Sequence, residues 1–414
     1  MSVSARGLAA LTAVAWLALG TVACGARDAV ELIYPRQDDA ARPVMTVDYT
    51  QQLTQPDNFV LRPDEFGGAA VDPQRGLLYA GSRDGFLFAL EQDDGSVRWD
   101  LELGGAVGSV PVIVEAQGDD ESMILVGTDN GLMHAIALSD RRTVWSYETP
   151  GRIRNPAVVH EGVVFFVNSR DQIYALDLRT GLWRWQYEQE LQTDFTVHGH
   201  GGLSFTPAAE QGVELGTIHA CFDNGKVVAL AAGSGQALWI ASVAPPEGGD
   251  FIDCDSTPLV DLEQGLVFVA GQSTGVVALE LESGDERWRF PMRGAGSIVA
   301  ASDGSLVGSS SLEGVFVLER DGSRMRWRSP TDPGVLSTPV VVGNSVFVTH
   351  SELGLLAFDL GTGELAAQLR TGSGMGSVPV YDPARQRLFA ISNRGVFVAL
   401  RVGDAVTETA ADLW

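Results

Sequence analysis

Hydrophobic and polar positions along the chain repeat in units of roughly 40 to 54 residues, a period typical of arrays and propellers. Each unit starts with a short segment such as Ser109–Val114 and continues with an apolar run such as Met123–Thr128. A turn and a second apolar run follow, as in Asn130–Ile136, and a further turn leads to a fourth segment that usually carries Trp. Short apolar runs separated by Asn-Gly and Asp-Gly predict β-strands joined by hairpins.

The turn between the second and third segments can be counted along the chain, and it occurs eight times. It lies at Gly85, Gly131, Gln172, Gly225, Gly275, Gly314, Gly354 and Gly395. Four strands per unit predict an all-β fold, an eight-bladed β-propeller of four-stranded antiparallel blades over residues 44–402. The eighth unit lacks a fourth segment, and Val44–Leu53 has the alternation to supply it. We therefore expect an N-terminal strand to close the ring and remove an open edge.

The recurrent aromatic residue of the fourth segment predicts a packing role against the neighbouring blade. These residues are Trp99, Trp145, Trp185, Trp239, Trp288 and Trp327, and Tyr49 holds a similar place in the closing strand. Unit seven has "GELAAQL" instead, so we expect its outer edge to be the least packed. Residues 24–43 read as a linker and residues 403–414 as an exposed tail.

Composition narrows the classes of partner. The 414-residue chain is 45% hydrophobic and 20% charged, with a net charge of −25 and Lys226 as its one lysine. Binding of nucleic acid needs clustered cationic side chains, which this chain lacks. The same charge disfavours docking on anionic lipid headgroups.

The N-terminus has the features of an export signal. Arg6 precedes an apolar run from Leu8 to Leu19 that is too short to span a bilayer, so residues 1–23 are predicted to be a removable signal peptide. The segment before Cys24 resembles a bacterial lipobox, which makes Cys24 the lipidated first residue of the mature chain. Cleavage after Ala23 or Ala26, leaving a soluble periplasmic protein, is the alternative.

The Trp-bearing units resemble the PQQ-like propeller repeat of quinoprotein dehydrogenases. Within that superfamily the chain is more similar to the family of the outer-membrane assembly factor BamB, through its signal and lipobox, its closing strand and two irregular connections at residues 195–208 and 248–260. The resemblance implies a non-catalytic, periplasm-facing lipoprotein of the outer membrane that supports insertion of β-barrel proteins. A propeller that binds a different envelope protein or ligand is the alternative, and a quinoprotein-type enzyme is a further one.

The resemblance also implies a partner surface. In the family these two connections contact a periplasmic domain of the barrel-inserting subunit BamA, through a hydrophobic and basic loop and an Asp-x-Asp-x-Thr-Pro stretch. Asp253, Asp255 and Thr257 keep the second element, whereas Phe195, Val197 and His198 replace the leucines and arginine of the first. The residues alone leave two other readings of the aspartates open, a solvated or strand-capping pair and a calcium site.

The remaining candidate chemistry is sparse. His198, His200, His219 and Cys221 form a cluster of the types that bind zinc or copper, although ordinary loop and strand histidines explain them as well. The chain has no adjacent cysteine pair of the kind that the quinone-dependent enzymes carry, and we expect neither a cofactor nor catalysis. Cys221 and Cys254 lie in neighbouring predicted blades, so they are either a disulfide or two buried thiols. We expect a monomeric ring.

Overall fold

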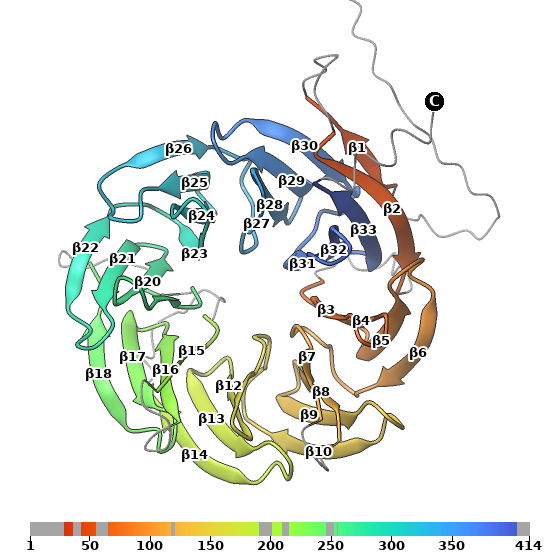
Figure 1. Cartoon of the computed structure of the whole chain (residues 1–414), viewed down its shortest axis with the longest axis horizontal. Helices are drawn as coiled ribbons and strands as arrows, with labels where there is room; N and C mark the ends of the chain where they lie inside the picture. The colour runs from red at the N-terminus through yellow and green to blue at the C-terminus, as the bar shows by residue number, and fades with distance from the viewer. Residues whose placement is uncertain are drawn as a thin grey trace, which may run out of the picture.

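The computed structural model describes residues 29–35, 43–54, 65–116, 121–189, 201–208, 215–245, 252–254 and 256–403. In this part of the chain eight antiparallel sheets surround a central axis, as Figure 1 shows. The architecture is the eight-bladed β-propeller expected from the repeat, and the described residues contain no helix.

Blades one to four follow the chain from the N-terminal side, each with its first strand innermost. Blade one is β3 (Ala69–Asp72), β4 (Leu77–Gly81), β5 (Phe86–Glu91) and β6 (Val97–Glu102). Blade two is β7 (Val112–Val114), β8 (Met123–Gly127), β9 (Leu132–Ala137) and β10 (Thr143–Glu148). Blade three is β11 (Val158–His160), β12 (Val163–Val167), β13 (Gln172–Asp177) and β14 (Trp183–Glu188). Blade four is β15 (Ser204–Pro207), β16 (Gly216–Cys221), β17 (Lys226–Ala231) and β18 (Ala237–Ser242).

Blades five to eight complete the ring and bring the two ends of the chain together. Blade five is β19 (Leu259–Asp261), β20 (Leu266–Gly271), β21 (Gly275–Glu280) and β22 (Glu286–Phe290). Blade six is β23 (Ala295–Ala300), β24 (Leu306–Ser310), β25 (Gly314–Leu318) and β26 (Met325–Ser329). Blade seven is β27 (Val340–Val342), β28 (Ser345–His350), β29 (Gly354–Asp359) and β30 (Leu365–Arg370), with β1 (Glu31–Ile33) added outside β30. Blade eight is β31 (Val380–Asp382), β32 (Arg387–Ile391) and β33 (Val396–Val402), closed by β2 (Met45–Gln52).

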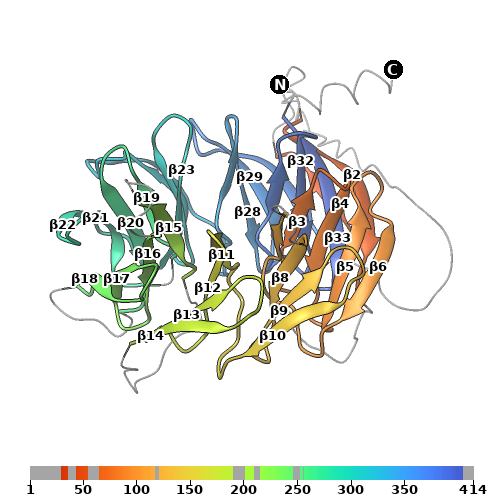
Figure 2. The same ribbon diagram turned by 60° about the horizontal axis from the view of Figure 1, so that its bottom comes forward.

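The strands of each blade run between the two faces of the ring, as the turned view in Figure 2 shows. Because neighbouring strands are antiparallel, the turns between second and third strands share one face with the connections between blades. We call this face the connection rim. The turns between first and second strands and between third and fourth strands lie on the other face, the hairpin rim. In the turn before β13 the left-handed residue is Asp171, with φ 56°, and not Gln172 as the repeat alignment predicted. Aspartate tolerates this conformation better than most residues.

The core lies between blades. The buried apolar side chains of the described residues form eight clusters, and each cluster combines residues of two adjacent sheets, as in the pairing of Val227 and Trp239 of blade four with Val267 of blade five. Flat apolar faces packed in a circle leave no sheet face unpaired. This explains why the second and third strands read as almost continuous apolar runs.

Where the fourth strand carries the recurrent tryptophan, its ring can contact the next blade around the ring. Trp239 of blade four lies opposite Ala229 on the neighbouring strand. Its ring covers Gly284 in the turn between the third and fourth strands of blade five. Its Nε1–H donates to the carbonyl of Leu281 at 3.0 Å. The ring contact recurs between Trp145 and Gly181, Trp185 and Gly235, Trp288 and Gly322, and Trp327 and Gly363. Tyr49 covers Gly95 in the same way and donates from its hydroxyl to the Gln92 carbonyl at 3.0 Å.

The N-terminal segment differs from the prediction at one point. Residues 24–43 read as a linker, and the outer edge of blade seven read as the least packed, but β1 within that segment pairs with β30 and covers this edge. The pairing was hidden in the sequence because three residues are too few to show an alternating pattern. Residues 1–23, Cys24 and residues 404–414 lie outside the described residues.

Candidate functional site

The predicted partner surface falls at the junction of blades three, four and five on the connection rim. Of its six residues the structure describes Asp253 and Thr257, whereas Phe195, Val197, His198 and Asp255 lie outside the described residues. Thr257 is exposed, two residues before the first strand of blade five. Its position is therefore the best defined point of the candidate site.

The segments that flank the two predicted loops are joined by hydrogen bonds. The Gly202 N–H, just after the first loop, donates to Thr257 Oγ1 at 2.9 Å. Asn155 Nδ2, from the start of blade three, donates to the Gly201 carbonyl at 3.2 Å. A Cβ on Gly202 would lie 2.6 Å from Thr257 Oγ1, so the residue must be glycine for this contact to form. The backbone after the first loop thus lies against the second loop.

Asp253 departs from the expectation of an exposed carboxylate. Asp253 is only 4% exposed. Its backbone carbonyl lies so close to Gly271 of β20 that a Cβ on Gly271 would collide with it. The neighbouring Cys254 is fully buried and its N–H donates to the Phe222 carbonyl at 3.3 Å. The segment is therefore drawn into the seam between blades four and five, which a sequence pattern alone does not reveal.

Cys221 and Cys254 are joined in a disulfide, with their Cα atoms 5.4 Å apart. Cys221 ends β16 of blade four, and Cys254 precedes the first strand of blade five, so the bond crosses the seam next to Thr257. A crosslink that closes a loop of 33 residues restricts the unfolded chain and contributes about 4 kcal/mol in the chain-entropy model. The geometry thus selects the disulfide from the two alternatives that the sequence left open.

Of the four predicted zinc or copper ligands, the structure describes His219 and Cys221. Cys221 is in the disulfide and cannot act as a thiolate, and His198 and His200 lie outside the described residues. His219 is fully buried, its Nε2 is 3.1 Å from Thr206 Oγ1, and burial lowers the pKa of its imidazole to about 4. Across the described ranges no group of three or more His, Cys, Asp or Glu side chains is placed to hold a metal ion.

Sequence reasoning missed a second group on the connection rim, where the chain passes from blade eight to blade one. Phe66 is 41% exposed, and the Arg154 guanidinium lies 4.4 Å from the centre of its ring. Arg154 also donates to both oxygens of Asp129, at 2.9 and 2.6 Å. Next to Phe66, Glu65 is only 1% exposed and accepts from the Arg83 N–H at 3.2 Å. Burial raises the pKa of the Glu65 carboxyl to about 8.

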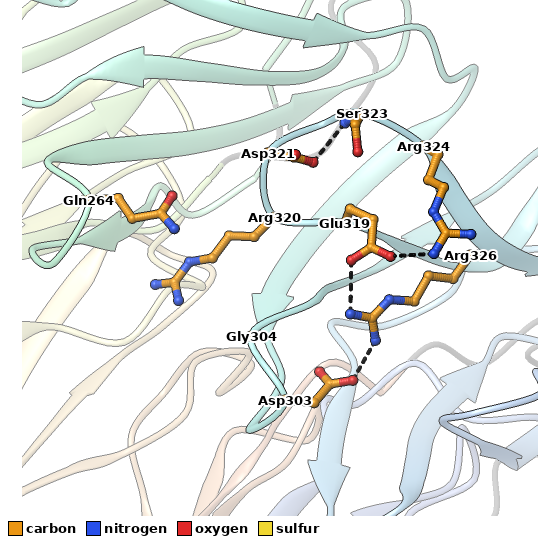
Figure 3. A pocket seen from close by; sticks show the side chains of 9 residues that line it. All are labelled: Gln264, Asp303, Gly304, Glu319, Arg320, Asp321, Ser323, Arg324 and Arg326. Atoms are coloured by element: carbon orange, nitrogen blue, oxygen red, sulfur yellow. Dashed lines mark hydrogen bonds and ion pairs between the residues drawn. The ribbon is translucent and has the colours of Figure 1, made fainter.

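An open pocket of about 440 Å³ lies on the hairpin rim between blades five and six (Figure 3). Its charged side chains form ion pairs with one another. Glu319 accepts from Arg324 and Arg326, both at 2.9 Å, and Arg326 also pairs with Asp303. Arg320 pairs with Asp261, which is buried beneath the pocket. Because its arginines are already paired with acids, the pocket has the character of a surface ion-pair cluster more than that of a binding site.

Comparison with known proteins identifies one family that this chain matches over most of the ring. The family model of the outer membrane protein assembly factor BamB matches residues 116–329 and 273–408. A BamB of Yersinia pestis is 25% identical over 280 residues, which cover 66% of each chain. A BamB of Nitrosomonas eutropha is 27% identical over 221 residues, 51% of this chain and 49% of the relative. These matches span about half to two thirds of the length of those relatives.

Solved structures support the fold. The crystal structure of BamB from Moraxella catarrhalis is similar with a TM-score of 0.68 at 19% identity, over 86% of this chain and all of that one (100%). A quinohemoprotein alcohol dehydrogenase of Comamonas testosteroni reaches a TM-score of 0.64 at 14% identity, over 89% of this chain and 78% of that one. At such identities the likeness extends to the fold alone. In the described part of the chain, no helix is long and apolar enough to cross a membrane.

Proposed function

This chain belongs to the family of the outer membrane protein assembly factor BamB, and from that membership we propose that it is a non-catalytic scaffold lipoprotein for the assembly of β-barrel proteins in the outer membrane. The observation that carries the proposal is the family match over residues 116–408, which covers most of the ring. In this proposal Cys24 carries the lipid, and the ring stands on the periplasmic face of the outer membrane.

The proposed partner is a periplasmic domain of a BamA-like subunit, bound at the connection rim between blades three and five. Thr257 provides the exposed, described part of this surface, and Phe195, Val197, His198 and Asp255 extend it. We assign Asp253 a different role, because its side chain is buried: it positions the loop and does not contact the partner directly.

Two features of the described residues support a role in binding. The Gly202–Thr257 hydrogen bond and the Cys221–Cys254 disulfide fix described residues at the ends of both loops before any partner arrives. Association costs conformational entropy whenever interface segments must become ordered, so restrained loops bind more tightly than free ones with the same contacts. Because its core lies between blades, the ring offers little freedom for domain motion, and this suits a scaffold better than a protein whose function depends on such motion.

The test is capture of the purified periplasmic domain of the BamA-like protein of the same organism, measured by surface plasmon resonance. Thr257→Arg should weaken binding at least about tenfold, because a bulky cation there also removes the acceptor for Gly202. The matched control is Thr338→Arg, in the same Ser-Thr-Pro sequence at the start of blade seven. Asp255→Arg and Phe195→Asp test the remainder of the surface.

The outcomes separate the proposal from its alternatives. Equal loss in the Thr257 and Thr338 variants would mean a general effect on the ring and would move the interface elsewhere. Absence of wild-type capture, together with recovery of another envelope protein from extracts, would favour the alternative of a propeller with a different partner. Thermal melts of each variant establish whether the fold is retained.

A further inference from the structure

The outer edge of blade seven carries a strand that no other described blade has. β1 pairs antiparallel with β30, with Glu31 opposite Arg370, Leu32 opposite Leu369 and Ile33 opposite Gln368. The remaining seven sheets of the described chain have four strands each. In Figure 1, β1 lies outside β30 and next to β2, beside the seam where the ring closes.

The reason for the extra strand lies at that seam. Ala367 occupies the register position that tryptophan holds in other blades, opposite Ala357. A tryptophan there would have no turn to cover, because the third strand of blade eight ends the described chain and its fourth strand, β2, comes from the N-terminal side. The seam between blades seven and eight therefore needs another cover.

The β1 segment supplies this cover. Val30, Leu32 and Tyr34 pack against the buried cluster between blades seven and eight, which includes Leu369 and Met45. The Tyr34 hydroxyl donates to the Met45 carbonyl of β2, and burial raises the pKa of that hydroxyl to about 12. The segment thus contacts both blades that meet at the seam, and it is attached to the ring by main-chain pairing, apolar packing and a side-chain hydrogen bond.

The position of β1 also limits how far the ring can lie from Cys24. Six residue steps separate Cys24 from Val30, and a chain spans at most about 3.5 Å per residue, so the path cannot exceed about 21 Å. The limit holds for any conformation of the intervening residues. Without β1, the first attachment to the ring would be Met45, 21 steps from Cys24 by the difference of their numbers, and the permitted path would rise to about 74 Å.

We propose that β1 is a clasp that fastens the lipid anchor to blade seven, so that this side of the ring faces the membrane. The inference rests on lipidation of Cys24, which is part of the proposed function. Blades three and four, half the ring away, are then held on the far side from the bilayer. The loops that join blade three to blade four and blade four to blade five are left open to a periplasmic domain, and the acidic ring needs no affinity for lipid headgroups of its own.

The experiment measures the orientation of the ring on a membrane. The full mature lipoprotein is reconstituted in vesicles of phosphatidylethanolamine and phosphatidylglycerol that carry an energy acceptor on a small fraction of headgroups. A donor dye is attached to Thr362→Cys in blade seven or to Thr180→Cys in blade three, without reductant, so that the Cys221–Cys254 disulfide stays closed. Both threonines are exposed in equivalent turns between third and fourth strands, which makes them a matched pair.

Energy transfer to the lipid should be at least about twofold more efficient from position 362 than from position 180. Two changes should remove that difference while the protein still floats with the vesicles. One is Val30→Asp with Leu32→Asp, which removes the apolar contacts of β1. The other is a spacer of about 20 Gly and Ser residues between Arg27 and Asp28, which leaves β1 intact and adds a root-mean-square reach of about 25 Å.

Equal transfer from both positions in the wild type would overturn the proposal, as would a difference that survives the spacer, since another contact would then orient the ring. Failure of the wild type to float would overturn it too, because no anchor would exist for β1 to fasten. Capture of the BamA-like domain is measured separately on lipid-free protein. Loss of capture with the orientation intact would refute the scaffold function alone, and the reverse result would refute the clasp alone.

Discussion

The interlock between the tryptophan of one blade and the turn glycine of the next can be tested at Gly284 in blade five. This residue has φ +76°, and a Cβ on it would lie 2.6 Å from Cε3 of Trp239. Gly265, in the other turn of the same blade, has φ +65° and no atom within 4 Å of its Cβ position. Alanine at either site must therefore adopt a positive φ, but only at Gly284 does its Cβ also collide with a neighbouring side chain.

The expected magnitudes follow from these two conditions. A left-handed conformation costs an alanine about 1–2 kcal/mol, so Gly265→Ala should lower the free energy of unfolding by about that amount. Gly284→Ala also adds an overpacked contact against the indole ring of Trp239, and this contact costs about 1–3 kcal/mol more. The total loss at Gly284 should be about 2–5 kcal/mol.

Urea unfolding followed by tryptophan fluorescence measures both variants, with the slope of the transition as a check that the cooperative unit is unchanged. A third arm uses Trp239→Ala, which removes the ring that the new methyl group would strike. In that background Gly284→Ala should cost no more than Gly265→Ala, so the two changes are non-additive. Equal losses for Gly265→Ala and Gly284→Ala in the wild-type background would refute the interlock.

Three further predictions concern the closing strand, the disulfide and the buried carboxyl of Glu65. Deletion of residues 44–53 should leave blade eight with three strands and an open edge, so the melting temperature should fall and the protein should aggregate; an unchanged melt with a monomeric column profile would contradict ring closure by β2. Non-reducing peptide mapping should recover Cys221 and Cys254 in one crosslinked peptide pair, and their joint replacement by Ser should lower stability by about 4 kcal/mol; alkylation of both thiols without reductant would exclude the bond. Burial raises the pKa of Glu65 from 4.5 to about 8, so the folded state keeps a proton that the unfolded state releases, and stability should fall as pH rises from about 4.5 to about 8. Urea titrations at pH 5 and pH 8 measure how much the free energy of unfolding falls between the two pH values, and Glu65→Gln should make this fall smaller. An equal fall in the wild type and the variant would contradict a buried neutral carboxyl at this site.

The ring itself could be predicted from the sequence because its signals are local. A turn glycine, the apolar run on either side and the aromatic residue four positions later all lie within one hairpin, and the hairpin recurs. The number of blades, the closing strand β2 and the place of Tyr49 therefore follow from the pattern, and the resemblance of the repeat already points to the family. The stand-in for glycine at Asp171 was misplaced by one residue, because positive φ is a property of the backbone and several residue types can adopt it.

Contacts between distant segments were decided only by the tertiary structure. The pairing of Glu31–Ile33 with β30 joins residues more than 330 positions apart, and it arises because the seam of the ring lacks the turn that a tryptophan would cover. Asp253 reads as an exposed loop carboxylate, but the disulfide at Cys254 and the contact with Gly271 draw it into the interface of two blades. Phe66 and Arg154 come from different blade connections and meet only in the tertiary structure. Local patterns determine which strands form and how they turn, whereas burial at a seam depends on which surfaces the closed ring brings together.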